Sequence, residues 1–109
     1  MGIRDQLRDA CKVVGGEWSD RPARCVLPWG DVEIGFEWLG GRFLEVIQKD
    51  EEDHRETRII LSVDDIKKIS GIKGEVIDLD EVVEEGIDIE TKHGSQIHID
   101  LRGNITVWE

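Results

Sequence analysis

The strongest constraint on the fold is the regular alternation of apolar and polar residues in the last quarter of the chain. Ile, Leu or Val occupies every second position in three successive runs, which cover residues 87–90, 96–102 and 105–107. A period of two places the apolar side chains of a strand on one face. His93-Gly94 and Gly103-Asn104 lie between the runs, where two-residue hairpin turns belong. The pattern therefore predicts a three-stranded antiparallel meander.

Runs in the first half of the chain predict further strands of the same kind. They are rich in β-branched and aromatic residues and are separated by short breaks that contain Gly, Pro, Ser or Asp. A first strand begins near Glu17, and the later runs cover Arg24–Leu27, Asp31–Trp38, Arg42–Lys49 and Glu56–Leu61. Short breaks in this order favour consecutive antiparallel strands.

Helical spacing occurs at the N-terminus and again in the middle of the chain. From Ile3 to Val14 the apolar residues recur every three or four positions, which predicts an amphipathic helix that ends at Gly15 and Gly16. Ser62, followed by apolar residues at Ile66 and Ile69, predicts a second short helix near residues 63–70. We also expect a short strand over residues 76–79 and one acidic helical turn over residues 80–85.

These elements together define the predicted fold class. We expect one α+β domain over residues 1–109, in which the N-terminal helix packs on a mainly antiparallel meander sheet. The composition, 39% apolar and 36% charged, excludes a disordered chain and a membrane-spanning one. Charged residues within Met1–Asp9 leave no apolar core for a secretory signal, so we place the chain in the cytoplasm. Many Ile and Val residues with few Gln and Asn are typical of thermophiles.

Charge is distributed unevenly along the chain. The formal net charge is −11, and Asp50–Glu109 holds seventeen acids against seven bases, whereas Met1–Lys49 is nearly balanced. The stretch Glu75–Glu90 carries eight carboxylates and no Lys or Arg. A negative field repels nucleic acid and anionic membranes and attracts cationic partners. We therefore predict a basic protein partner, no direct nucleic-acid binding and no membrane association.

The predicted partner-binding residues combine this acidic stretch with one tryptophan. Trp29 lies between Pro28 and Gly30 in a turn, which favours an exposed ring, although a turn tryptophan can also fold over the edge of the core. The acidic stretch can likewise be a solvated surface that maintains solubility. The predicted contact residues are Glu81, Glu84, Glu85, Asp88, Glu90 and Trp29. An exposed sheet edge can also pair two copies of the chain, which the sequence neither requires nor forbids.

Two cysteines allow a covalent cross-link. Cys11 lies on the apolar face of the predicted helix, and Cys25 lies in a predicted strand that the helix can cover. A disulfide between them would act as a structural link, and two buried reduced thiols are the alternative. Their spacing is not that of a Cys-x-x-Cys redox motif, and no second pair exists to build a zinc site.

The histidines supply the candidate for metal binding. His98 and Asp100 are two residues apart on a predicted strand and share its polar face, and His93 lies in the preceding turn. Such residues can ligate a metal, although solvated side chains explain the same pattern. No serine lies in a nucleophile motif, and no glycine-rich run has the sequence of a phosphate-binding loop. We predict no catalytic residue and no cofactor.

Three functional hypotheses remain. The first is a small non-enzymatic interaction or regulatory module that docks on a basic partner surface. The second is a small metal-dependent or acid/base enzyme that uses His93, His98 and Asp100. The third is a mimic of the DNA phosphate backbone that inhibits a nucleic-acid-binding protein.

Overall fold

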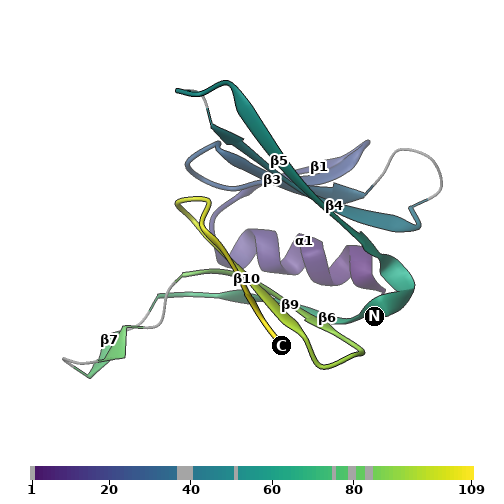
Figure 1. Cartoon of the computed structure of the whole chain (residues 1–109). Helices are drawn as coiled ribbons and strands as arrows, with labels where there is room; N and C mark the ends of the chain where they lie inside the picture. The colour runs from purple at the N-terminus through teal and green to yellow at the C-terminus, as the bar shows by residue number, and fades with distance from the viewer. Residues whose placement is uncertain (1, 37–40, 51, 75, 79–80, 83–84) are drawn as a thin grey trace.

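In the computed structural model, one helix lies between two antiparallel sheets (Figure 1). The structure describes residues 2–36, 41–50, 52–74, 76–78, 81–82 and 85–109. Helix α1 (Ile3–Val13) buries Leu7, Ala10 and Cys11 and ends before Gly15, whose φ of 76° suits glycine at a helix C-terminus. The predicted N-terminal helix and its stop are therefore confirmed, as is the α+β class.

The first sheet is an antiparallel meander in chain order, as predicted. Its five strands are β1 (Glu17–Asp20), β2 (Ala23–Val26), β3 (Val32–Phe36), β4 (Phe43–Asp50) and β5 (Arg55–Ser62). One row of paired residues crosses all five strands on the face that meets the helix: Trp18, Cys25, Ile34, Val46 and Ile59. All five of these side chains belong to the core or pack against it, so the row forms a continuous wall.

The second sheet contains the predicted C-terminal meander. Its strand order is β11 (Ile105–Trp108), β10 (Gln96–Asp100), β9 (Gly86–Thr91) and β6 (Ile66–Ile72). One row of this sheet consists of Ile69, Ile89, Ile97 and Val107. The three isoleucines are buried in the core that the helix shares, whereas Val107 is exposed. The neighbouring row on the opposite face consists of Ser70, Asp88, His98 and Thr106.

Both hairpin turns of this meander are one residue longer than the sequence predicts. Thr91 N–H donates to the Ser95 carbonyl, and Gly94 N–H donates back to the Thr91 carbonyl. Asp100, Gly103 and Asn104 repeat this arrangement in the next turn. Each turn has three residues, and its glycine has a positive φ of 88° or 93°. The prediction of two-residue turns was therefore wrong, although it identified the glycines.

The predicted second helix over residues 63–70 is also wrong. Only Val63–Asp65 form a single 3₁₀ turn, and Ile66 begins strand β6. The pairing of β6 with β9 shifts by one residue between Ile66 and Lys68, as at a β-bulge. The extra residue allows both Ile66 and Ile69 to be buried, with two exposed residues between them. A bulged strand thus produces the three-residue spacing that is typical of a helix.

A two-stranded hairpin lies between β6 and β9. It consists of β7 (Val76–Asp78) and β8 (Glu81–Val82), and Figure 1 shows β7 well away from the two sheets. Strand β7 agrees with the predicted strand over residues 76–79 as far as residue 78, and residue 79 lies outside the described residues. The predicted acidic helical turn is wrong at Glu81 and Val82, which pair with β7, and its residues 80, 83 and 84 lie outside the described residues.

One apolar core joins the helix to both sheets. The helix approaches β6 closely at Gly71. A Cβ added to this glycine would lie only 2.7 Å from the Ala10 carbonyl oxygen and 2.8 Å from Val13 Cβ. The turn between β10 and β11 also touches the first sheet, where the Gln48 side-chain amide donates to the Gly103 carbonyl. In the described part of the chain, no helix is long and apolar enough to cross a membrane.

Candidate functional site

The β7–β8 hairpin is the most prominent feature outside the core. In its antiparallel pairing, Asp78 is opposite Glu81 and Val76 is opposite Val82. The sequence around this hairpin is strongly acidic, with eight carboxylates in the stretch Glu75–Glu90. The stretch Glu75–Glu90, which contains this hairpin, offers no Lys or Arg. A cation for these carboxylates must therefore come from elsewhere in the chain or from another molecule.

The predicted partner-binding acids lie in different environments. Glu81 lies in β8, and Glu84 lies outside the described residues. Glu85 is half-buried just before β9, and Glu90 is half-buried on β9, paired with Lys68 and Gln96 across the sheet. Asp88 is engaged by its own chain, because its carboxylate accepts from the Gln96 amide at 3.2 Å and contacts His98.

Trp29 is exposed as predicted, with 62% of its surface accessible. It lies in the turn between β2 and β3, and the guanidinium carbon of Arg102 is 6.0 Å from its ring centroid, a cation–π contact. Arg102 follows Asp100, which pairs with Gly86 at the start of β9. Trp29 therefore lies at the end of the second sheet from which the acidic hairpin emerges.

The three residues proposed for metal binding have separate roles. His98 is 7% exposed, and its Nδ1 lies 2.5 Å from Asp88 Oδ1. The Asp100 carboxylate accepts from the backbone N–H groups of Arg102 and Asn104, both at 2.9 Å, and so fixes the turn between β10 and β11. His93 Nε2 lies 3.7 Å from Asp65 Oδ1.

Within the described ranges, no three His, Cys, Asp or Glu residues form a group that could hold a metal ion. The geometry therefore gives the metal hypothesis no support.

The two cysteines are bonded to each other. The Cα atoms of Cys11 and Cys25 are 5.8 Å apart, and both residues are fully buried. The disulfide joins α1 to β2, the second strand of the first sheet. Gly16 packs beside it, since a Cβ added there would lie 2.9 Å from each sulfur atom. The bond is thus a structural link between the helix and the first sheet.

Two acidic and two basic side chains on the outer face of the first sheet balance each other's charge. Glu45 is 8% exposed and lies 4.0 Å from Arg24 and 3.9 Å from Arg58. A hydrogen bond to Glu56, with the charges of Glu45 and Glu56, raises the pKa of the Arg58 guanidinium above its ordinary value. These side chains come from β2, β4 and β5, so the group links strands across the sheet and leaves little net charge for a ligand.

Sequence reasoning missed a cavity of about 340 Å³ beside the first turn of α1. Its walls come from that turn, from the hairpin between β1 and β2, and from the chain on either side of the β3–β4 connection. The lining residues are Arg4, Asp20, Arg21, Pro22, Ala23, Phe36 and Gly41. They are far apart in sequence and match no motif, so only the closure of the fold reveals the cavity.

Comparison of the chain with protein-family models, curated proteins and solved structures gave no significant match.

Proposed function

We propose that this chain is a small acidic, non-enzymatic interaction module that docks on a basic partner surface. The docking surface, called here the acidic arm, consists of the β7–β8 hairpin and Glu85, and Glu84, which lies outside the described residues, is a further predicted contact. The position of this hairpin away from the two sheets (Figure 1), combined with the run of carboxylates, is the observation that carries the proposal. A projecting, uniformly charged segment steers association with an oppositely charged partner.

The charge around the hairpin supports a cationic partner. In the backbone register Asp78 is paired with Glu81, and the stretch Glu75–Glu90 around this hairpin contains eight carboxylates and no Lys or Arg. A two-stranded hairpin is at best marginally stable when it lacks further strands or a packed face. A Lys or Arg side chain from a partner would offset the excess of negative charge in this stretch.

Removal of three charges from the acidic arm tests the proposal. The variant Glu81→Gln/Glu84→Gln/Glu85→Gln should weaken capture of a basic partner from the native host about tenfold, because three rim ion pairs contribute roughly 0.5 kcal/mol each. The dependence of affinity on salt should decrease in parallel. Affinity is measured by surface-immobilised titration at low and high salt, with circular dichroism as the check on folding.

The matched control removes the same total charge from other surfaces. Asp9, Glu17 and Asp64 are exposed and make no ion pair with any described residue, so Asp9→Asn/Glu17→Gln/Asp64→Asn should leave capture within twofold of the wild type. Equal losses in the two variants would mean that overall charge drives binding. Unchanged capture in the arm variant would show that the arm is not the docking surface.

A further inference from the structure

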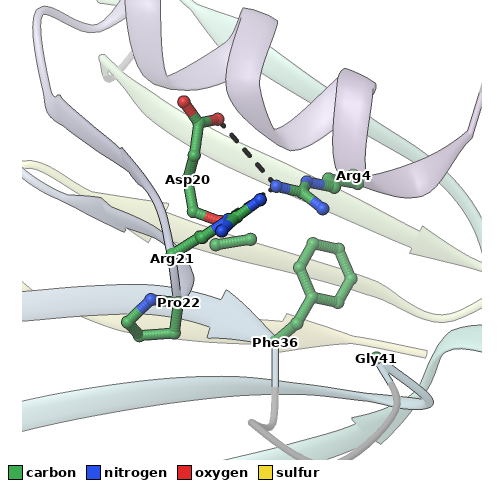
Figure 2. Close-up of a pocket in the computed structure, with 7 residues that line it drawn as sticks. Arg4, Asp20, Arg21, Pro22, Phe36 and Gly41 are labelled. Carbon is green, nitrogen blue, oxygen red and sulfur yellow. Dashed lines mark hydrogen bonds and ion pairs between the residues drawn. The ribbon is translucent and has the colours of Figure 1, made fainter.

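We infer that the cavity beside the first turn of α1 binds a small organic anion that has an apolar body. Figure 2 shows the side chains of Arg4 and Arg21 above the cavity, with Phe36 and Pro22 on its other sides. A volume of about 340 Å³ is at the small end of the roughly 300–1,000 Å³ that is typical of small-molecule sites. The cavity therefore suits a ligand with one ring or a short chain.

Arg4 is held in place at the cavity. Its Nη2 donates to the Asp20 backbone carbonyl at 2.9 Å, so the guanidinium is held at the rim of the cavity. Its separation from the Asp20 carboxylate is 3.9 Å, too long for a hydrogen bond. That carboxylate already accepts from Trp18 Nε1 at 2.8 Å. Arg4 is thus fixed in place by the backbone, while much of its hydrogen-bonding capacity remains for a ligand.

Arg21 brings a second guanidinium group to the cavity. This residue lines the same cavity and makes no hydrogen bond or ion pair with the residues that the structure describes. The chain has 25 acids and 14 bases, whereas the described residues that line the cavity include two arginines and one acid, which reverses the balance of charge among them. A guanidinium fork binds carboxylate or phosphate through two parallel hydrogen bonds. The rim therefore selects an anionic headgroup.

The cavity also has an apolar wall. Phe36 is 7% exposed and Ala23 is 9% exposed, so both are held in place by the core. Pro22 and Gly41 complete this wall without adding a side-chain charge or a side-chain hydrogen-bonding group. An inorganic ion would leave the wall in contact with water, and a neutral apolar molecule would leave the arginines without a partner. The two halves of the cavity together favour an amphiphilic anion.

This inference is independent of the proposed docking function. The cavity lies beside α1 and the first sheet, whereas the acidic arm emerges from the second sheet. The two surfaces also select opposite charges, so a negative result for one leaves the other unaffected. An anion at the cavity would be a separate ligand of the same chain.

Titration with matched small molecules tests the inference. Benzoate and phenyl phosphate carry the two candidate headgroups, while benzyl alcohol lacks the charge and inorganic phosphate lacks the ring. Each is added to the ¹⁵N-labelled chain at about 0.15 M salt, where the long-range repulsion of the net charge is largely screened. We expect at least one aromatic anion to bind tenfold more tightly than both partial ligands and to shift the amide signals of Ala23 and Phe36. The tighter of the two aromatic anions identifies the headgroup.

Two variants with a matched control locate the site. Arg21→Gln should weaken binding of the better aromatic anion about tenfold, because it removes a charge-assisted pair, and should leave the melting temperature unchanged. Phe36→Leu retains an apolar side chain but removes the ring, and should weaken the same binding about threefold. Arg55→Gln removes an equal charge from the exposed start of β5 and should leave affinity within twofold.

The outcomes are distinct. Binding that requires both parts of the ligand and falls in Arg21→Gln but not in Arg55→Gln supports the inference. Equal binding of inorganic phosphate and phenyl phosphate, equal losses in the two arginine variants, or no saturable binding of either aromatic anion would overturn it.

Discussion

Reduction of the Cys11–Cys25 disulfide should lower the stability of the chain by a predictable amount. The bond closes a loop with a sequence separation of 14 residues. The loss of loop-closure entropy in the unfolded chain corresponds to about 3 kcal/mol for a loop of this length. A domain of 109 residues has an unfolding entropy of roughly 0.23 kcal/mol/K near its melting temperature, so the expected decrease in Tm is about 13 °C.

The comparison requires oxidised and reduced forms of the same sequence. Both cysteines are fully buried, so the bond must be reduced in denaturant before the chain is refolded. Alkylation followed by mass spectrometry verifies the number of free thiols, and circular dichroism gives the two melting curves. In Cys11→Ala/Cys25→Ala the bond cannot re-form, and the Tm should be equal to or lower than that of the reduced chain, because the lost sulfur atoms leave a small cavity.

Two results would refute this reasoning. Free thiols in the native chain, purified without reductant, would show that the cysteines are not bonded. A reduced chain that melts within about 3 °C of the oxidised chain would show that the cross-link adds little to the packing around it. Loop-closure entropy would then not be a significant part of the stability.

Three further substitutions test the packing and the hydrogen bonds. Gly71→Ala should destabilise the chain by about 2 kcal/mol in urea denaturation, since the added methyl would meet the Ala10 backbone, whereas Gly2→Ala, in open space, should change stability little. Asp100→Ala should cost about 2 kcal/mol, measured in the same way, because it leaves two turn N–H groups without their acceptor. Glu45→Gln should cost about 2 kcal/mol in thermal unfolding because it removes the carboxylate beside a largely buried Arg24, and an unchanged Tm would show that the ion pair contributes nothing.

Much of the fold was predictable because strand periodicity is a local property. The first-sheet strands and the C-terminal meander follow from alternation within short windows. The division into two sheets was not predictable in this way, since it depends on which strand pairs with β6. Ile66 and Ile69 show the limit most clearly, because a bulge that is invisible in the sequence gave a strand the apolar spacing of a helix.

The candidate sites were less predictable than the fold. Sequence position placed Trp29 in a turn and Cys11 on the inner helix face, and the structure agrees with both. Alternation also placed His98 on the face away from the core, but it gave no sign that Asp88 would engage it. The cavity beside Arg4 is formed by residues brought together from three parts of the chain, so no local pattern could indicate it.

The disulfide divides the molecule into parts with different tolerance to damage. The helix and the strands of the first sheet come before Val63 and are fastened together by the covalent bond, whereas the strands of the second sheet come after it and are held in place by noncovalent packing. Mechanical pulling or proteolysis should therefore peel away the C-terminal half first and leave a closed N-terminal unit behind.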